Sequence, residues 1–408
     1  MTETIREMLE EESSKCISCG FCESVCPTLP DSGYQLSRGA RGRVILGRTI
    51  AETDIKSAPL KSFYDSFYSC LDCFACLQVC PAGVNAGKVS QLSRELIIEN
   101  TVPSERDPVA EMIVNVTEAT MNPLGQGKAM ASWSRGLDFE KDSPYLLYTG
   151  NMYQLMSYTG PLNSMRSMMG HGLSGAMARL IASRPSLSSI MGLQNDRKIA
   201  ERMNGILRII YNLLRKSGIS VWYLGTSEPY PGTFISDLGY TEKFRKYAER
   251  VYDILKKTGK KIIVIDPHTY DLMVNIYPRI IPGFDLEIIY YLDLIKDISL
   301  NKNSMKVAFH EPCHLVLRNP QKNTPKEIIE KNFIMRLSKR SGKKTMCCGG
   351  PTELLFPDLT KKVSDRRFKD LQSLGADRIV TACPICFANL NKNSNVIEIS
   401  ELIASNLA

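Results

Sequence analysis

The chain has 408 residues, of which 43% are hydrophobic, so it is long enough for two or three domains with substantial cores. Its formal net charge is +8, yet no basic run is interleaved with stacking aromatic residues, which argues against a nucleic-acid partner. No window of about 18 consecutive apolar residues is present, so we expect a chain that does not span a membrane.

The 13 cysteines indicate the cellular compartment, because they lie in clusters typical of metal ligands. Residues 1–15 are acidic and lack the apolar segment of a secretory signal. We therefore expect a cytoplasmic protein, with peripheral attachment at the inner membrane face as the alternative. Residues 1–100 hold 10 Lys and Arg against 13 Asp and Glu, so the positive excess lies further along. That excess is either an ordinary soluble surface or a face for an acidic partner or an anionic membrane.

Two runs of four cysteines follow a helix that is predicted over residues 2–13. They read Cys16-x-x-Cys19-x-x-Cys22-x-x-x-Cys26-Pro27 and Cys70-x-x-Cys73-x-x-Cys76-x-x-x-Cys80-Pro81. This is the spacing of bacterial ferredoxins with two 4Fe–4S clusters, in which the fourth cysteine of each run binds the other cluster. The expected ligands are Cys16, Cys19, Cys22 and Cys80 for cluster 1, and Cys70, Cys73, Cys76 and Cys26 for cluster 2. The alternative is a pair of zinc sites, which usually take two cysteines from each of two separated pairs.

The segment between the two runs is predicted to be helical. A helix is expected to begin near Arg38 and to continue to Arg48, and apolar residues recur at helical spacing between Leu60 and Tyr68. Residues 1–100 are therefore expected to form a helical ferredoxin domain. The arginines after the first run either offset the negative charge of the first cluster, dock a partner, or remain solvated.

Residues 101–144 are rich in proline and glycine with little periodicity, so we expect a connector there. Residues 150–203 hold 8 of the 17 methionines. Because methionine fills irregular cores and adaptable surfaces, this part is either a helical insertion with a methionine core or a soft docking surface.

From residue 219 onward, short apolar runs alternate with helical stretches, which is typical of α/β sheets. Strands are expected at 219–224, 262–265, 307–309, 379–380 and 396–399, and helices at 240–257, 326–339 and 359–374.

A third group of cysteines lies in three loops of this C-terminal part. Its members are Cys313, Cys347, Cys348, Cys383 and Cys386. Two of the loops follow predicted strands, where α/β folds place their sites. Five thiols exceed the four that a zinc ion or one cubane needs, which favours a larger or more open centre with a bridging thiolate. A structural zinc with a spare cysteine is the alternative. His310 and His314 flank Cys313 and are candidates for orienting the site or relaying protons, or they are hydrogen-bonded loop residues.

An internal repeat without cysteines precedes this group. The segment from Ile262 through Asp266-Pro267 to Tyr270 resembles the one from Ile379 through Cys383-Pro384 to Phe387, and 34 residues separate Pro231 from Asp266 as they separate Cys348 from Cys383. Non-metal-binding residues stand where thiols would be: Tyr230, Pro231, Asp266 and Thr269. His268, in the same segment, is expected to be structural. We expect an α+β multidomain fold with two pseudo-symmetric α/β lobes, a degenerate one over residues 145–300 and an intact one over 301–408.

The C-terminal pattern Cys313…Cys347-Cys348-Gly349…Cys383-x-x-Cys386 resembles the CCG domain of heterodisulfide reductases. That domain also occurs in iron–sulfur subunits of glycolate oxidase, lactate-utilisation enzymes and anaerobic glycerol-3-phosphate dehydrogenase. The segments Arg41-Gly42-Arg43-Val44 and Asn122-Pro123-Leu124-Gly125 recur across the group as well. The resemblance implies a noncubane 4Fe–4S cluster on the five C-terminal cysteines, one of them bridging. In the family, heterodisulfide cleavage uses two such clusters, one in each lobe, and the first lobe of this chain departs from that pattern.

The expected function is therefore that of an electron-transfer subunit in an oxidoreductase complex. Electrons would pass between a flavoprotein dehydrogenase or reductase and an acceptor, and a membrane-associated, quinone-linked partner is a further expectation. One alternative is catalytic reduction of a disulfide or sulfur compound at the CCG cluster, and another is a scaffold with structural zinc there. No nicotinamide fingerprint, Walker loop or flavin motif is present, so any flavin belongs to the partner.

Overall fold

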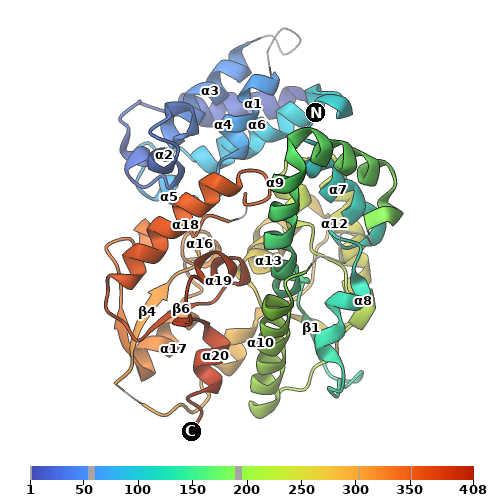
Figure 1. The fold of residues 1–408 in the computed structure, drawn as a ribbon, viewed down its shortest axis with the longest axis vertical. Helices are drawn as coiled ribbons and strands as arrows, with labels where there is room; N and C mark the ends of the chain where they lie inside the picture. Colours follow the sequence, from blue (N-terminus) through green and yellow to red (C-terminus); the bar gives the residue numbers. More distant parts are fainter. Residues whose placement is uncertain (1, 54–59, 189–194, 303, 351) are drawn as a thin grey trace.

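The computed structural model describes residues 2–53, 60–188, 195–302, 304–350 and 352–408. A helical N-terminal part lies at the top of Figure 1, above two small parallel sheets with their helices. Among the described residues, no helix is both long and apolar enough to cross a bilayer.

The N-terminal part is built on three helices that pack against one another: α1 (Thr2–Ser14), α3 (Ala40–Glu52) and α6 (Ala86–Asn100). Leu9, Val44 and Val89 bury their side chains between them. Both helices that the sequence predicts here, over residues 2–13 and from Arg38, are confirmed in type. Shorter elements carry the cysteine runs and the segment between them: η1 (Phe21–Ser24), α2 (Thr28–Asp31), η2 (Leu36–Arg38), η3 (Leu60–Phe63), α4 (Tyr64–Tyr68) and α5 (Ala75–Gln78).

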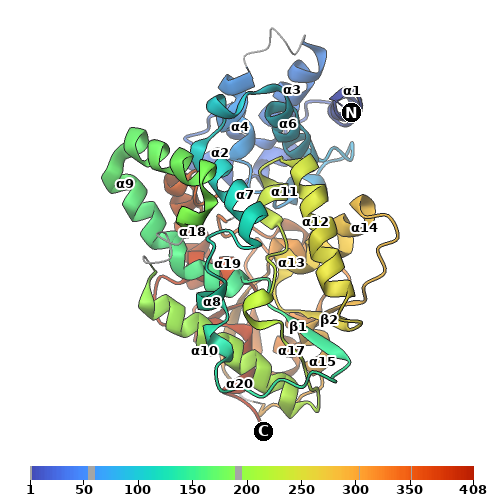
Figure 2. The ribbon, with the colours of Figure 1, turned by 90° about the vertical axis from the view of Figure 1, so that its right-hand side faces the viewer.

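The first sheet has the order β1-β2-β3, with all strands parallel. Its strands are β1 (Tyr145–Tyr148), β2 (Lys261–Val264) and β3 (Ile288–Tyr290). A long crossover from β1 to β2 contains α9 (Met152–Ser183), α10 (Arg197–Lys216), η7 (Gly225–Ser227), α11 (Thr233–Asp237) and α12 (Thr241–Lys256). After β2 come α13 (Pro267–Asp271), the π-helical turn η8 (Leu272–Ile276) and α14 (Tyr277–Ile280), and α15 (Tyr291–Ile295) follows β3. Figure 2 shows α12 beside β1 and β2.

The second sheet has the order β5-β4-β6-β7, again with all strands parallel. Its strands are β4 (Lys306–His310), β5 (Ile334–Arg336), β6 (Arg378–Thr381) and β7 (Val396–Glu398). The helices around it are α16 (Cys313–Val316), α17 (Thr324–Asn332), η9 (Gly342–Lys344), α18 (Pro357–Gln372), α19 (Pro384–Leu390) and α20 (Ile399–Ala404).

The two sheets meet near their C-terminal edges. The hydroxyl of Tyr290, at the end of β3, donates to the carbonyl of Ala382 at 3.3 Å, and the hydroxyl of Tyr153 donates to the Glu398 carboxylate at 3.3 Å. The N-terminal part rests on the second sheet through α18, which lies beneath α2 in Figure 1. There Arg366 donates to the carbonyl of Pro27 at 2.7 Å and to the carboxylate of Asp31 at 2.8 Å. Forked guanidinium contacts of this kind fix orientation.

Two local predictions are wrong. The strand expected over residues 219–224 makes a single bridge, between Leu146 and Trp222, because Gly225 with a φ of +63° turns the chain away. The helix expected over 326–339 ends at Asn332, because the Ile334 amide donates to the Met305 carbonyl at 3.0 Å and the segment joins β4 as β5. Pairing with a neighbouring strand overrides local helical spacing.

The stretch expected as a connector contains more structure than predicted. It holds η4 (Pro103–Glu105), α7 (Pro108–Thr120), α8 (Gly127–Met130) and η5 (Ser132–Ser134). Helix α7 begins with an Asp107 carboxylate that accepts from two backbone amides, followed by Pro108 at the first helical position. Its apolar face packs against α9. The methionine-rich segment is helical in its described part, and Met152, Met156 and Met203 are buried in the core.

Candidate functional site

One cavity in the N-terminal part is lined by four thiols. They are Cys26, Cys70, Cys73 and Cys76, the set that the spacing predicts for cluster 2. Burial raises the pKa of each of the last three thiols, so in the absence of metal they are protonated. Four cysteine sulfurs around one enclosed space are the donor set of a 4Fe–4S cluster, and the residues present fit that group.

A buried arginine beside this cavity supports a negatively charged occupant. Arg43 is 2% exposed, and its Nη1 lies 3.8 Å from the Sγ of Cys26. Its other donors reach the Ser66 carbonyl at 2.7 Å and two hydroxyls, those of Thr28 and Ser69. None of the described carboxylates forms an ion pair with it. A buried cation is stable only when it is paired, so the structure leaves the countercharge to a cluster in the cavity.

This position corrects the sequence-based reading of the arginines after the first run. Arg43 lies at the second cavity and not beside the first cluster. Arg41 is half-buried and pairs with Glu23 at 3.2 Å, while Arg38 pairs with Asp65 at 2.7 Å. Arg48 donates to the carbonyl of Ser13 at 2.6 Å. Of the four arginines after the first run, Arg38, Arg41 and Arg48 therefore each have a partner other than a cluster.

The other four thiols of the two runs lie near the surface. Burial, the charge of Glu23 and then the charges of Cys16, Cys26 and Cys80 raise the pKa of Cys22 to about 12, which places these sulfurs together. The Ser18 amide donates to Cys16 Sγ at 3.4 Å and the Val84 amide to Cys80 Sγ at 3.2 Å. Cys19 is exposed, and the neighbouring Ile17 and Phe21 are 67% and 60% exposed. This set, predicted for cluster 1, is thus the one open to a partner.

The five C-terminal thiols converge because three neighbouring strands end at one edge. Cys313 follows β4, the pair Cys347 and Cys348 comes after β5, and Cys383 and Cys386 follow β6. All five are buried. They interact in series: Cys313 with Cys347, Cys347 with Cys348, Cys348 with Cys386, and Cys386 with Cys383. Four of them line one cavity, and the fifth, Cys347, donates to the Gly350 carbonyl at 3.3 Å.

Glycine is required twice in this loop. Gly349 has a φ of +107°, which L-residues with a side chain avoid. A Cβ on Gly350 would lie 2.2 Å from Cγ2 of Ile385, so the loop approaches α19 as closely as a backbone can. The Cys-Cys-Gly-Gly sequence therefore places two adjacent thiols against the thiols of α19.

The central thiol of the group is Cys348. Hydrogen bonding with the neighbouring thiols of Cys347 and Cys386 lowers the pKa of Cys348 well below the usual range, whereas hydrogen bonding with Cys313 and then with Cys348 raises the pKa of Cys347. A thiol with a lowered pKa and four more sulfur donors around it fits an iron–sulfur centre with a bridging ligand. It exceeds what one tetrahedral ion requires.

His310 faces the same sulfurs from the end of β4. Arg367 Nε donates to its Nδ1 at 3.1 Å, and burial lowers the pKa of His310, so the neutral ring carries its proton on Nε2. A ring nitrogen of His310 lies within 4.8 Å of the sulfurs of Cys348 and Cys386. His310 Nε2 has no hydrogen-bond partner among the described residues and would donate to the sulfur of a bound cluster, while Arg367 fixes its tautomer.

The second histidine candidate, His314, has a different environment. Its Nδ1 lies 2.8 Å from the carboxylate of Asp271, which also pairs with Arg318 at 2.5 Å. Burial, and next the charge of His268, lower the pKa of His314 to about 4. The two imidazole rings pack at 3.9 Å between centroids, and both line the cavity of the thiols.

His268, expected to be structural, instead lines the cavity of the C-terminal thiols. It stands on α13, directly after β2, and its Nε2 lies 3.3 Å from the Asp237 carboxylate. Burial lowers its pKa, but the charge of Asp237, the hydrogen bond to it and the charges of Asp266 and Asp271 together raise the pKa of His268 to about 9. No local pattern distinguishes His268, because only the meeting of the two sheet edges brings it there.

We expect His310 to tune the C-terminal centre. Replacement of His310 by leucine should lower the reduction potential of that centre by on the order of 50 mV, because a charge-assisted hydrogen bond of about 1.5 kcal/mol corresponds to roughly 60 mV for one electron. His310→Gln, which can still donate to sulfur, should keep most of the potential. Potentiometric titration followed by electron paramagnetic resonance measures both. Equal shifts in the two variants would contradict the assignment.

The three thiol sets form a series in space. Burial, and after it the charge of Cys313, raise the pKa of Cys73, so the second set borders the C-terminal one. At the same junction the guanidinium of Arg318 lies 4.2 Å from the ring centroid of Phe74, and Gln78 donates to the Leu317 carbonyl at 3.5 Å. Cys26 and Cys22 join the second set to the first.

Two family models match the chain where the thiols lie. Residues 12–84 match a 4Fe-4S dicluster domain, and residues 307–391 match the CCG cysteine-rich domain. The chain thus carries 4Fe–4S ligation in its N-terminal part and a further iron–sulfur centre in its C-terminal part.

Several curated proteins are similar over nearly the whole chain. A probable membrane-anchored ferredoxin of Chromohalobacter salexigens is 22% identical over 96% of this chain and 59% of its own length. The EtfAB:quinone oxidoreductase of Syntrophomonas wolfei is 21% identical over 98% of this chain and 58% of its length. One subunit of the dihydromethanophenazine:CoB–CoM heterodisulfide reductase of Methanosarcina barkeri is 22% identical, and 97% of this chain covers 94% of that subunit. The chain therefore spans little more than half of the first two relatives.

Proposed function

Because the chain belongs to the CCG-domain iron–sulfur family of heterodisulfide reductase and glycolate oxidase subunits, we propose that it passes electrons between a flavoprotein partner and a second acceptor. Its relatives are subunits of oxidoreductases, and in that role this chain is the iron–sulfur component of such a complex. The observation that carries the proposal is the linear order of the three thiol sets, from the exposed Cys19 through the second cavity to the buried C-terminal one.

Each thiol set has its own task in this proposal. Cys16, Cys19, Cys22 and Cys80 hold cluster 1, Cys70, Cys73, Cys76 and Cys26 hold cluster 2, and Cys313, Cys347, Cys348, Cys383 and Cys386 hold a noncubane third cluster. Bound 4Fe–4S groups accept and release single electrons at potentials set by charge, hydrogen bonds to sulfur and burial. In this chain, Arg43 supplies the charge, and backbone amides and His310 supply the hydrogen bonds to sulfur.

The partner docks, in this proposal, where cluster 1 reaches the surface. Ile17 and Phe21 expose apolar side chains on both sides of Cys19, as protein interfaces require of their centre. The neighbouring Glu11 and Glu23, with Arg41 and Lys15, provide a charged rim. A flavoprotein suits this face, because the chain has no flavin motif of its own. We place the chain in the cytoplasm, with a membrane-associated, quinone-linked complex as its second contact.

We further propose that residues 145–300 and 301–408 are related lobes, preceded by a ferredoxin domain over 1–100 and a connecting stretch over 101–144. The order β1-β2-β3 supports this, because it corresponds to β4-β6-β7. Asp266 and Cys383 support it as well: each lies two residues beyond its strand, and each caps a short helix that opens with proline. The Asp266 carboxylate accepts from the amides of His268 and Thr269, so a cap has replaced a ligand.

A second candidate function is reduction of a disulfide or sulfur compound at the C-terminal centre. The polar groups around the thiols favour it, since His268 and His314 line one side of the cavity and Arg318 pairs with Asp271, which is hydrogen-bonded to His314. The absence of thiols among the corresponding residues of the first lobe argues against the two-cluster mechanism of the family. A scaffold with structural zinc remains the third candidate.

Metal content and turnover separate the three candidates. The electron-transfer proposal predicts about twelve irons per chain, from three four-iron clusters, and no reaction with disulfides by the isolated chain. Catalytic reduction predicts the same iron with disulfide-dependent oxidation of a reduced dye. About eight irons with one zinc would identify the scaffold. Measurement on anaerobically purified protein, together with whatever co-purifies from the native host, decides among them.

A further inference from the structure

A strongly basic segment precedes the Cys347–Cys348 loop. Between Glu330 and Glu353 the sequence holds six cations and no carboxylate. Five of the six cations are exposed, and the sixth, Arg340, is half-buried. We call this surface the basic face, and its members are Lys331, Arg336, Lys339, Arg340, Lys343 and Lys344.

The cations of the basic face have no local countercharges. None of them forms an ion pair with a carboxylate among the described residues, and two neighbouring carboxylates have other partners. Glu330 pairs with Lys326 at 3.8 Å, and Asp370 pairs with Arg367 at 2.5 Å. Cations on an edge strand also deter pairing with other chains, but β5 ends at Arg336 and four of the six cations lie beyond it. An unpaired surface of one sign attracts a partner of the opposite sign.

The basic face is fixed in place beside two thiol sets. The Gly342 amide donates to the buried Glu311 carboxylate at 2.5 Å, and the Thr345 hydroxyl donates to the Glu311 carbonyl at 3.1 Å. Between these two anchors, η9 packs against α5, the helix that carries Cys76 of the second set. Cys347 of the C-terminal set comes three residues after the end of η9. The cations of η9 therefore lie next to both of the thiol sets that meet at this junction.

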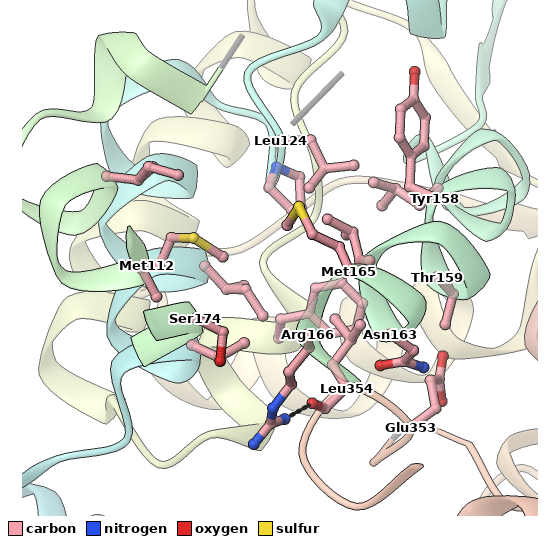
Figure 3. A pocket seen from close by; sticks show the side chains of 18 of the residues that line it. Met112, Leu124, Tyr158, Thr159, Asn163, Met165, Arg166, Ser174, Glu353 and Leu354 are labelled. Carbon is pink, nitrogen blue, oxygen red and sulfur yellow. Dashed lines mark hydrogen bonds between the residues drawn. The ribbon is translucent and has the colours of Figure 1, made fainter. Parts of the chain in front are cut away.

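The other side of the Cys347–Cys348 loop is covered by the chain itself. Glu353 and Leu354, which follow the loop, line an apolar pocket against α9. Figure 3 shows Arg166 of α9 beside Leu354, whose carbonyl accepts a hydrogen bond from the guanidinium. The basic face is thus the more exposed side of this loop.

The composition of the basic face selects a protein as its partner. Ile334 and Leu337 are 40% and 38% exposed among the cations, and apolar contacts within a charged rim are typical of protein interfaces. No aromatic residue lies between Phe333 and Phe356, so the face lacks the stacking platforms of nucleic-acid sites. Residues 333–344 form a strand, a short 3-10 helix and loops, whereas lipid surfaces are bound by long amphipathic helices.

We propose that the basic face docks an acidic electron-carrier protein, which takes up electrons from the thiol sets beside it. This inference rests on the proposed function, and it adds an acidic carrier to the partners named there. In each encounter one electron leaves an iron–sulfur centre of the chain, which is oxidised, and reduces the carrier by one electron. The flavoprotein at cluster 1 then replaces that electron. No bond forms or breaks in the transfer.

The first test is the salt dependence of electron transfer. Iron-loaded protein, reduced anaerobically and freed of excess reductant, is mixed in a stopped-flow instrument with flavodoxin, an acidic carrier whose flavin absorbance reports electron uptake. The second-order rate constant should fall at least about tenfold between about 20 mM and about 300 mM salt, because ions screen the attraction between the two surfaces. A rate constant that does not change with salt would overturn the proposal.

The second test reverses the charge of the basic face. The variant changes three of its exposed lysines together: Lys339→Glu, Lys343→Glu and Lys344→Glu. The matched control makes the same change in charge at three exposed lysines in the crossover of the first sheet: Lys216→Glu, Lys246→Glu and Lys257→Glu. At low salt the first variant should reduce flavodoxin at least about tenfold more slowly than the control, and both should keep their iron. Equal rates in the two variants would refute the assignment of the basic face.

A small oxidant keeps this inference separate from the proposed function. The hexaammineruthenium(III) cation needs no docking surface, so the charge-reversed variant should reduce it at least as fast as the unmodified protein does. Reduction of the ruthenium complex, with flavodoxin rates that are equal in both variants, would remove the docking proposal alone. Failure of the unmodified, iron-loaded protein to reduce the ruthenium complex would remove the electron-transfer function on which the inference rests.

Two further measurements identify other occupants of the basic face. Sedimentation with phosphatidylglycerol vesicles that is lost on charge reversal, while the flavodoxin rate is unchanged, would assign the face to lipid and overturn the proposal. Salt-dependent self-association of the unmodified protein that is lost in the same variant, again with an unchanged flavodoxin rate, would assign the face to a second copy of the chain. Neither vesicle binding nor self-association is expected to depend on these lysines.

Discussion

Arg43→Met should lower the reduction potential of the second N-terminal cluster by on the order of 100 mV. The guanidinium is buried, reaches within 3.8 Å of the Cys26 sulfur, and has no ion-pair partner among the described carboxylates. A unit positive charge about 5 Å from the cluster, at an effective dielectric constant near 20, stabilises the reduced cluster by about 3 kcal/mol, because the reduced state is the more negative one. Each 1.4 kcal/mol corresponds to 59 mV for one electron, which sets the expected shift. Redox titration with spectroscopic detection measures it.

Two variants control this result. Arg41→Met removes the same charge two residues earlier, but Arg41 is half-exposed and already pairs with Glu23 at 3.2 Å, so the shift should be small. Arg43→Lys retains the charge while losing the fork that reaches the carbonyl of Ser66 and the hydroxyls of Thr28 and Ser69. Its potential should therefore stay closer to that of the unmodified protein than that of Arg43→Met. A shift of the same size in Arg41→Met would mean that Arg43 is not the countercharge of the second cavity.

Cys348→Ser should remove the C-terminal centre while leaving the N-terminal clusters intact. Cys348 contacts Cys347 and Cys386 and faces His310, so it is the thiolate on which the five-sulfur site is organised. Iron should fall from about twelve to about eight per chain. The rate of electron transfer to the final acceptor should drop by more than about 100-fold. Removing a residue that only hydrogen-bonds to a metal ligand already costs up to about 100-fold in activity, and removing a ligand should cost more. Iron determination and the N-terminal paramagnetic signals report the two effects separately.

The matched control in the same loop is Met346→Leu, which removes a buried sulfur next to the ligands without changing the volume much. It should keep all of the iron. The reciprocal variant, Cys73→Ser, should lose the second N-terminal cluster and keep the C-terminal signal. Loss of every signal in Cys348→Ser would show that the two parts of the chain do not load iron independently.

Local patterns in the sequence were sufficient for the thiols and for most elements around them. Ligand spacing within a run is a property of a few consecutive residues, so the two ferredoxin-type runs and the Cys-Cys-Gly loop were recognisable without a structure. The strands β2, β4, β6 and β7 and the helices α12 and α18 were predicted because their apolar periodicity is uninterrupted. Prediction failed where contacts with segments distant in sequence determine the secondary structure. The segment of β5 is a strand because it pairs with β4, and α7 is stabilised by packing against α9.

Only the tertiary structure decided which charged and polar groups serve the thiol sites. The sequence alone determined that this chain carries three sets of cysteines in metal-binding patterns, because those patterns are short and regular. It could not place Arg43 beside the second cavity or His268 in the cavity of the C-terminal thiols. Each of these positions depends on contacts between helices or sheet edges that are far apart in the sequence. Spacing along the chain therefore defines the ligands, whereas long-range packing supplies the charges and protons around them.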